Sequence, residues 1–162
     1  MKTILVPLDF SAISEEAVDT AISLAADIHA QVVLLHVIHE ELVYNGLGVT
    51  LAQYAEVSKT VETKTDEALA PFLRRAAERG VHALPHRMQG MPVSRILDEA
   101  RQLDASFIVM GSHGHGALYE LFIGSTALGV LKNAPCPLIL VPPNSAHAKA
   151  GAPEAEQSVS AK

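Results

Sequence analysis

The sequence predicts a doubly wound α/β domain, with helices on both faces of a five-stranded parallel sheet in the strand order 3-2-1-4-5. Short apolar runs alternate with segments whose apolar residues recur every three or four positions, which is the period of an amphipathic helix. The third apolar run contains Pro85, and a proline favours an edge strand because it cannot donate to the ladder. Distinctive turns follow the first and fourth runs, and this strand order reverses between those two strands.

The beginning of the chain predicts a strand, a helix and a second strand. Residues 2–8 and 32–38 are apolar runs of strand length, which indicates strands that are covered on both faces. Ser11 or Ser14 can cap the intervening helix, because a serine hydroxyl accepts a hydrogen bond from a free N–H group. A strand, a helix and a strand in this order predict a right-handed parallel unit.

A loop and a long helix are predicted next. Residues 40–49 contain an Asn-Gly pair and a further glycine, which are typical of a loop. A helical pattern then extends from residue 51 to Gly80, and the glycine can terminate it. Pro71 lies inside this pattern. Because a proline within a helix removes one hydrogen bond and clashes with the preceding turn, we expect a bend or a break near residues 69–70.

The second half of the chain supplies the remaining three strands. Residues 81–88 form a third strand of mixed polarity, suited to the edge of the sheet. A Gly-Met-Pro turn then leads into a helix with Pro92 near its first position. Residues 105–110 and 137–141 are apolar runs that predict the fourth and fifth strands.

Composition limits the classes of protein to which this chain can belong. Its 162 residues suggest one domain, residues 1–143, and 49% hydrophobic residues are enough for a core. Residues 144–162 lack apolar periodicity and are expected to form a disordered tail. The net charge of −6 argues against nucleic-acid binding, and no apolar run reaches membrane-spanning length. A single cysteine, Cys136, is expected to be a small buried apolar residue and fits a cytoplasmic location.

The most informative stretch is residues 111–126, which read GSHGHGALYELFIGST. Its glycines fall where the chain leaves the fourth strand, turns, and enters a helix that begins at Ser125 and Thr126. Glycine has no Cβ to hold an anion away and permits positive φ, while the start of the helix offers unpaired N–H groups. This combination predicts an anion cradle, with phosphate as its expected occupant. The spacing fits neither the P-loop nor the dinucleotide fingerprint.

Written as G-x-x-G, nine residues, then G-S, this motif resembles the signature of the ATP-binding branch of the universal stress protein family. Residues 4–11 resemble the first strand and aspartate turn of that family, residues 33–38 resemble its second strand, and the resemblance covers residues 2–142. It implies that Pro7 and Val37 border the adenine and that Asp9 contacts the ribose or adenine side. The residues implied at the nucleotide are Pro7, Asp9, Val37, Met110, Gly111, Gly114, His115, Gly116, Gly124, Ser125 and Thr126.

Each of these residues also has a purely structural interpretation. Asp9 is a good helix cap, although its position after the first strand favours contact with a ligand. From the residues alone, Val37 belongs to the core. The glycines can form a tight turn without a ligand. Ser125 can act as an ordinary helix cap, and that role is compatible with phosphate binding.

The histidines do not point to a metal centre. His113 and His115 form a His-x-His pair, but no Cys or carboxylate follows at the spacing of a zinc site. Both are expected to be solvated loop residues or weak phosphate contacts. The other histidines of the expected strands are predicted to be satisfied by hydrogen bonds: His36, His82 and His86.

The cradle is equipped to hold ATP, with Mg²⁺ or Mn²⁺ balancing its charge, and poorly equipped to consume it. No Lys or Arg occurs between Arg101 and Lys132, and efficient phosphoryl transfer requires a cationic clamp. The sequence therefore favours an ATP-binding regulatory or sensor protein of the stress response. Two alternatives stay open: a slow ATPase or autophosphorylating enzyme that uses Ser125 or Thr126, and a nucleotide-free protein-interaction module.

The fifth strand carries a prediction about assembly. It would be an edge strand, and its residues are too apolar to be left open to water. The family resemblance implies a homodimer that pairs the two copies of this strand, which consists of Leu138, Ile139, Leu140 and Val141. A further protein partner is compatible with a regulatory role.

Overall fold

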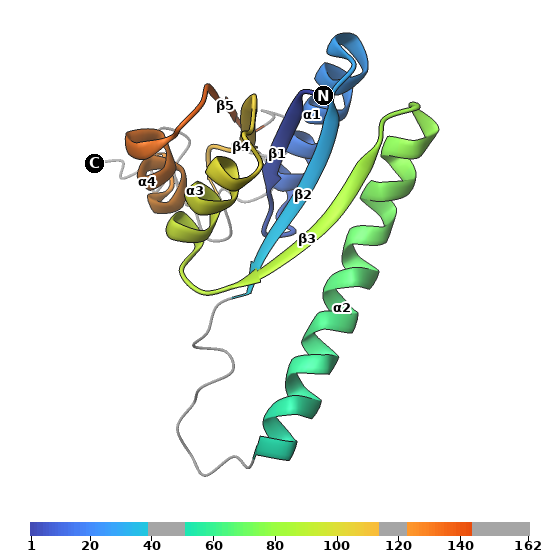
Figure 1. The fold of residues 1–162 in the computed structure, drawn as a ribbon, viewed down its shortest axis with the longest axis vertical. Coiled ribbons are helices and arrows are strands. Elements are labelled where there is room, and N and C mark those ends of the chain that lie inside the picture. Colours follow the sequence, from blue (N-terminus) through green and yellow to red (C-terminus); the bar gives the residue numbers. More distant parts are fainter. Residues whose placement is uncertain (39–50, 114–122, 144–162) are drawn as a thin grey trace, which may run out of the picture.

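The computed structural model describes residues 1–38, 51–113 and 123–143. The predicted loop at residues 40–49 and the predicted tail at residues 144–162 lie outside them. In chain order the elements are β1 (Thr3–Pro7), α1 (Ala12–Ile28), β2 (Gln31–Ile38), α2 (Leu51–Glu78), β3 (Ala83–Gln89), α3 (Pro92–Gln102), β4 (Phe107–Gly111), α4 (Ser125–Asn133) and β5 (Leu138–Val141) (Figure 1).

The five strands form one parallel sheet in the order β3-β2-β1-β4-β5, which confirms the predicted order. β1 is the central strand, and its Leu5 lies opposite Val33 of β2 on one side and Ile108 of β4 on the other. β3 lies at one edge, as its proline predicts. Because β1 and β4 are parallel neighbours, the segments that follow them emerge at the same edge of the sheet.

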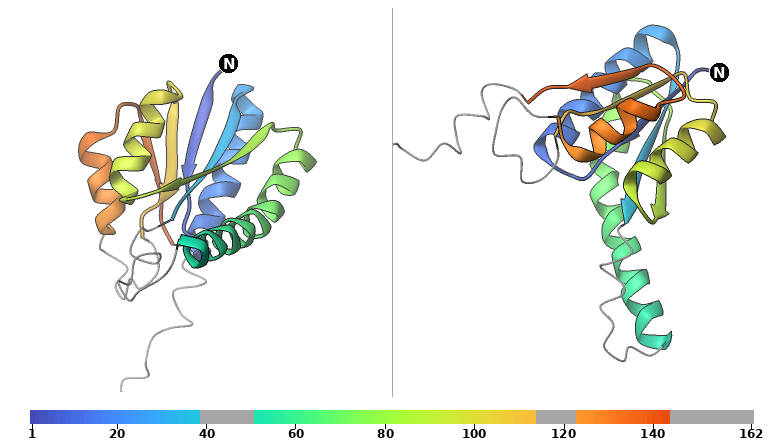
Figure 2. Two further views of the ribbon diagram at one scale, coloured as in Figure 1. Left: turned by 60° about the horizontal axis from the view of Figure 1, so that its bottom comes forward. Right: turned by 90° about the vertical axis from the view of Figure 1, so that its left-hand side faces the viewer.

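Helices cover both faces of the sheet, as predicted: α1 and α2 cover one face, and α3 and α4 cover the other (Figures 1 and 2). Side chains alternate between the faces along each strand. Ile4 and Val6 of β1 pack toward α1 and α2, whereas Leu5 packs toward α3 and α4. All three side chains are fully buried. Burial on both faces explains why the strands of this protein are continuous apolar runs.

Of the bend or break expected in α2, the break is wrong, because one continuous helix runs through Pro71. Pro71 itself is exposed, but its neighbours Leu69 and Phe72 are buried against the sheet. A proline within a helix costs about 3 kcal/mol, whereas burying a leucine or a phenylalanine each stabilises by about 1.5–3 kcal/mol. Tertiary packing therefore outweighs the local preference. Although α2 has 28 residues, neither it nor any other described helix is long and apolar enough to span a membrane.

Of the three strand histidines, the expected hydrogen bond is found for His36, while His86 lies at ion-pair distance from a carboxylate instead. His36 of β2 bonds through Nδ1 to the carbonyl oxygen of Leu8 at 3.0 Å. Nδ1 of His86, on β3, lies 2.7 Å from Oε1 of Glu99, a carboxylate on α3 that is only 1% exposed. The prediction for His82 is wrong, because β3 begins one residue later and His82 lies exposed in the turn before it.

Candidate functional site

Two segments meet at the carboxyl edge of β1 and β4. We call residues 8–14, which lead from β1 into α1, the aspartate turn. We call residues 111–126, which lead from β4 into α4, the glycine segment; the structure describes its two ends, residues 111–113 and 123–126. The starts of α1 and α4 therefore lie along the same edge of the sheet (Figure 2). The predicted contacts Gly114, His115 and Gly116 lie outside the described residues.

A closed hydrogen-bond network holds the aspartate turn. Oδ1 of Asp9 accepts three hydrogen bonds: from the backbone N–H of Ser11 at 3.1 Å, from the Ser11 hydroxyl at 2.6 Å and from the Ser14 hydroxyl at 2.6 Å. The backbone N–H of Asp9 donates to the Ser14 hydroxyl oxygen at 3.1 Å. Ser11 is the N-cap of α1, and its side chain accepts from the Ser14 N–H at 3.4 Å. Of the two predicted caps, Ser11 is the N-cap of α1, whereas the hydroxyl of Ser14 donates to Asp9.

The residue after Asp9 is backbone-strained. Phe10 has φ of +62°, in the left-handed region, where a residue with a side chain costs roughly 1–2 kcal/mol. Its ring packs against the ring of His36 with a centroid separation of 4.6 Å and an interplanar angle of 40°. Sequence reasoning missed this feature. The only signal was an aromatic residue where a turn favours Gly, Asn or Asp.

Gly111 is required by packing between α1 and β4. It is the last residue of β4 and pairs with Val141 of β5. A Cβ at this position would overlap the Cγ2 methyl of Ile13 and would approach the carbonyl oxygen of His113 to 3.1 Å. Its φ is not positive. A positive φ therefore does not explain this glycine, and α1 sits against β4 because the side chain is absent.

Ser112 ties the described ends of the glycine segment together. Its N–H donates to the carbonyl oxygen of Val141 at 2.9 Å, and its own carbonyl accepts from the N–H of Gly124 at 2.8 Å. Its hydroxyl lies 2.8 Å from Nδ1 of His113, while Nε2 of His113 is buried and has no hydrogen-bond partner. Gly124 is thus placed directly beside the end of β4.

The start of α4 carries no side-chain cap among the described residues. Gly124 occupies the N-cap position with φ of −59° and ψ of 153°, so Ser125 is the first helical residue rather than the cap. The Gly124 carbonyl accepts the first helical bond, from the N–H of Leu128 at 2.9 Å. Glycine has no side chain to accept from the N–H groups of Thr126 and Ala127, the second and third helical residues that an N-cap side chain serves. Those N–H groups and the helix dipole therefore favour an anion at this end of α4.

The apolar residues predicted at the nucleotide belong to the sheet. Pro7 is buried at the end of β1 and pairs with Leu35. Met110 is 6% exposed and packs toward α3 and α4, and Val37 is half-buried against the same cluster. The structural interpretation of Val37 as a core residue therefore holds for its side chain.

Cys136 offers no nucleophile to this site. It is half-buried just before β5 and packs against the cluster under α3 and α4. Burial raises the pKa of its thiol, and the charge of Asp104 raises it further. At neutral pH the group is therefore mainly the protonated thiol, which is a poor nucleophile. The expectation of a small packing residue agrees with this environment, although the side chain is half-buried rather than buried.

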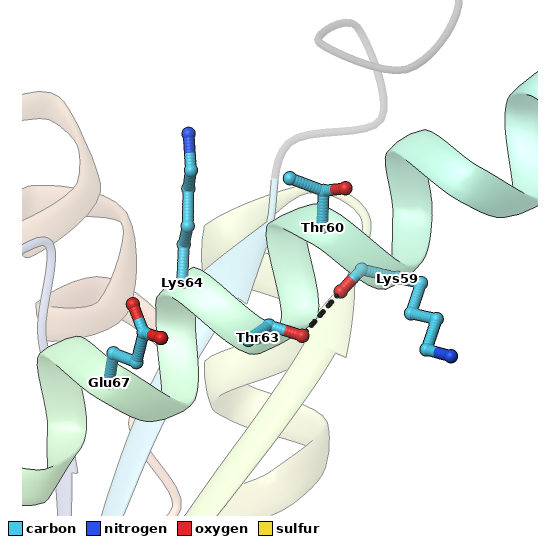
Figure 3. A pocket seen from close by; sticks show the side chains of 5 residues that line it. All are labelled: Lys59, Thr60, Thr63, Lys64 and Glu67. Atoms are coloured by element: carbon cyan, nitrogen blue, oxygen red, sulfur yellow. Dashed lines mark hydrogen bonds between the residues drawn. The ribbon is translucent and has the colours of Figure 1, made fainter.

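A shallow hollow elsewhere on the surface does not compete as a site. It is lined by residues of α2 alone: Lys59, Thr60, Thr63, Lys64 and Glu67 (Figure 3). The hydroxyl of Thr63 bonds to the carbonyl oxygen of Lys59 within the helix at 2.9 Å. One helix cannot enclose a ligand on several sides, and ligand sites are typically concave.

The fold defines a class: doubly wound α/β proteins, in which ligands bind at the carboxyl ends of the strands where the strand order reverses. In this protein the uncapped start of α4 lies at that edge. The sequence model described as "Universal stress protein family" matches residues 1–142. The chain belongs to the universal stress protein family.

Two curated relatives illustrate the similarity. Universal stress protein MJ0531 of Methanocaldococcus jannaschii is 32% identical over 140 residues, which cover 86% of this chain and 81% of the relative. Universal stress protein YxiE of Bacillus subtilis is 32% identical over 143 residues, which cover 85% of this chain and 96% of the relative.

Solved structures share the fold. The protein MJ0577 superposes with a TM-score of 0.78 at 25% identity, covering 88% of this chain and 96% of that one. A universal stress protein family protein of Arabidopsis thaliana with AMP bound has a TM-score of 0.66 at 18% identity, covering 91% and 95%. The universal stress protein of Archaeoglobus fulgidus in complex with dAMP has a TM-score of 0.61 at 22% identity, covering 87% and 98%.

Proposed function

We propose that this protein binds ATP in the crevice between the aspartate turn and the glycine segment and acts as a cytoplasmic regulatory or sensor protein of the stress response. The observation that carries the proposal is the start of α4, where Gly124 leaves the N–H groups of the first turn without a side-chain acceptor. A phosphate is the anion that such a helix start binds most commonly in nucleotide-binding folds.

The aspartate turn supplies the other end of the crevice. Asp9 stands at the end of β1 with its carboxylate oriented by Ser11 and Ser14, where it is suited to accept hydrogen bonds from a ribose or a base. Pro7 and Val37 would border the adenine. Two family members of known structure bind AMP and dAMP, and another binds cAMP, which supports an adenine nucleotide as the ligand.

The triphosphate would be held mainly by backbone and hydroxyl groups. Gly111, Gly114, Gly116 and Gly124 would leave room for it, with His115 and Met110 nearby, and Ser125 and Thr126 would add hydroxyls. Because residues 102–131 contain no Lys or Arg, a Mg²⁺ or Mn²⁺ ion coordinated by the phosphates would balance their charge.

Slow chemistry follows from the same composition. Backbone N–H groups that bind the ground state and the transition state equally do not accelerate hydrolysis. A missing arginine finger alone costs about 10³ to 10⁵ in rate. The nucleotide would therefore act as a signal that changes the surface seen by a partner.

The decisive experiment is native mass spectrometry of freshly purified protein, followed by calorimetry with ATP, ADP and AMP in the presence of Mg²⁺. We expect a co-purified adenine nucleotide or saturable binding. A protein that binds none of the three would be an interaction module, and the proposal would be wrong. Phosphate release at about 1 s⁻¹ or faster, the low end of ordinary enzymes, would make it an enzyme instead.

The sheet edge at β5 supports a second proposal, a homodimer that pairs two copies of this strand. Leu138, Ile139 and Leu140 are half-buried in the single chain, although each is a large apolar residue. Pairing across a two-fold axis would cover them. We expect a sedimenting dimer that Ile139→Lys converts to monomer, while Leu84→Lys on the opposite edge strand leaves it intact. A monomeric wild-type chain at micromolar concentration would refute this assembly.

A further inference from the structure

His36 touches both neighbours of Asp9. Its Nδ1 lies 3.0 Å from the carbonyl oxygen of Leu8, the residue before the aspartate, and its ring packs on Phe10, the residue after it. The carbonyl can only accept, so Nδ1 must carry the proton and donate it. One side chain of β2 thus brackets the aspartate turn from outside, while Ser11 and Ser14 hold the carboxylate from within.

The turn that His36 brackets cannot hold its shape by local preference alone. Phe10 has φ of +62°, and a bulky residue stays in the left-handed region only where its surroundings fix it. Leu8 is anchored on the strand side, because its N–H donates to the carbonyl oxygen of Leu35 at 2.9 Å. The far side of the turn is fixed by the start of α1, by the ring of His36 on Phe10, and by the packing of Phe10 against the core under α1 and α2.

We propose that His36 is a positioning residue for nucleotide binding: it fixes the aspartate turn through the Leu8 carbonyl and the Phe10 ring, so that Asp9 is in place before the ligand arrives. The inference rests on the proposed function. Binding to a turn that is already ordered costs less than binding to one that the ligand must order. His36 therefore contributes to affinity through Leu8 and Phe10.

Two substitutions separate the two contacts. His36→Asn keeps an N–H donor at the position of Nδ1 and removes the ring, whereas His36→Leu removes both the donor and the aromatic ring. We expect ATP affinity, measured by calorimetry at saturating Mg²⁺, to fall about tenfold in His36→Leu and only a few-fold in His36→Asn, since affinity follows how much of the ordering the ligand must supply. Phe10→Leu should resemble His36→Asn, because it removes the same ring contact.

The matched control is Val32→Ala. Val32 lies on the same strand and toward the same face as His36, is fully buried, and pairs with Ile4 at the opposite end of β1. It should lower the unfolding temperature and leave the ATP affinity of the folded protein unchanged. The unfolding temperature of every variant is measured without nucleotide, so that loss of affinity is separated from loss of fold.

The outcomes are distinct. If the wild type binds ATP and the three variants at positions 36 and 10 bind it equally well, or if Val32→Ala weakens binding as much as His36→Leu does, His36 is a structural residue and the inference is wrong, while the proposed function stands. If the wild type binds no nucleotide, both are wrong. Should His36→Leu fail to fold, the affinities of His36→Asn and Phe10→Leu decide.

Discussion

The two helices that begin at the carboxyl edge of β1 and β4 start in opposite ways. α1 begins at Ser11, whose side chain caps the helix and also bonds to Asp9. α4 begins at Gly124, which has no side chain to offer. The start of α3 is a useful reference, because its N-cap Met91 forms no cap either, but Pro92 follows and brings no N–H donor. Among the described helices with an N-cap assigned, α3 and α4 both lack a side-chain cap, and α4 leaves one more N–H donor, that of its first residue Ser125, to an external acceptor.

The comparison shows that the two ends of the proposed site have different roles. In the aspartate turn, Ser11 and Ser14 donate to Asp9 and His36 bonds to the Leu8 carbonyl, so the turn has a fixed shape, which suits it to orient a ligand. The start of α4 leaves its polar groups unsatisfied and so has an affinity for anions, which suits it to hold one. Substitution at the start of α4 should therefore change binding with little effect on stability, whereas substitution in the aspartate turn should change both.

The largest effect is expected when the start of α4 receives its own acceptor. In Gly124→Asp, the carboxylate would cap the helix and occupy the place of the phosphate with the same sign of charge. We expect ATP affinity to fall at least 100-fold, which corresponds to about 2.8 kcal/mol, while the free energy of unfolding changes by only a few tenths of a kcal/mol. Calorimetry and urea unfolding measure the two quantities.

Gly124→Asn is the control for charge, because it supplies a neutral cap. It should weaken ATP binding less than Gly124→Asp does. Full ATP affinity in Gly124→Asp would show that the phosphates lie away from the start of α4. The difference between the starts of α1 and α4 would then be unrelated to nucleotide binding.

The next largest effect is expected in the aspartate turn. Asp9→Ala leaves the hydroxyls of Ser11 and Ser14 without the oxygen to which both donate at 2.6 Å. We expect a loss of about 2–3 kcal/mol in the free energy of unfolding, since hydrogen bonds to a charged group are involved. The control is Asp27→Asn, at an exposed position of α1, which should change the free energy of unfolding by less than about 0.5 kcal/mol. A similar loss in both variants would mean that charge on α1, rather than the network, matters.

Gly111→Ala tests the contact that joins the two ends. The new Cβ would overlap the methyl group of Ile13, and overpacking of this kind costs roughly 1–3 kcal/mol, of which we expect about 1.5. The double variant with Ile13→Ala should be less destabilised than the sum of the single variants, because the overlapping atom is gone. Strict additivity of the three unfolding free energies would show that α1 does not constrain Gly111.

The smallest effects compare the two serines. Ser11→Ala should cost about 1 kcal/mol, as loss of an N-cap does. Ser125→Ala should stay within about 0.5 kcal/mol, because Ser125 is exposed and Gly124 holds the cap position. Thermal unfolding without nucleotide measures both. An equal cost would contradict the assignment of the caps.

The fold was largely predictable because its signals are local. Apolar runs and helical repeats give the elements, and one residue, Pro85, is enough to place β3 at the edge and so to fix the strand order. The glycine spacing similarly locates the start of α4 from sequence. The prediction of a break at Pro71 failed because the rule about prolines in helix interiors takes no account of the burial of Leu69 and Phe72.

The parts of the site that sequence reasoning missed depend on contacts between distant segments. The sequence around Gly111 does not predict its contact with Ile13, and the sequence around Phe10 does not predict its contact with His36. The left-handed backbone of Phe10 even opposes its residue preference. Such features follow from how β1, β2 and β4 bring their ends together, and they become visible only when the sheet is assembled.

The hydrogen bond between Ser112 and Gly124 has an evolutionary consequence. Because it fastens Gly124 to the end of β4, the placement of α4 does not depend on the length of the chain between the two residues. The entropy of closing a loop grows slowly, by roughly 0.6 kcal/mol for each doubling of its length. Insertions at residues 117–122, beyond the proposed contacts at Gly114, His115 and Gly116, should therefore be inherited or engineered at little thermodynamic cost, so this part of the chain is a suitable point for grafting a reporter domain that responds to a bound nucleotide.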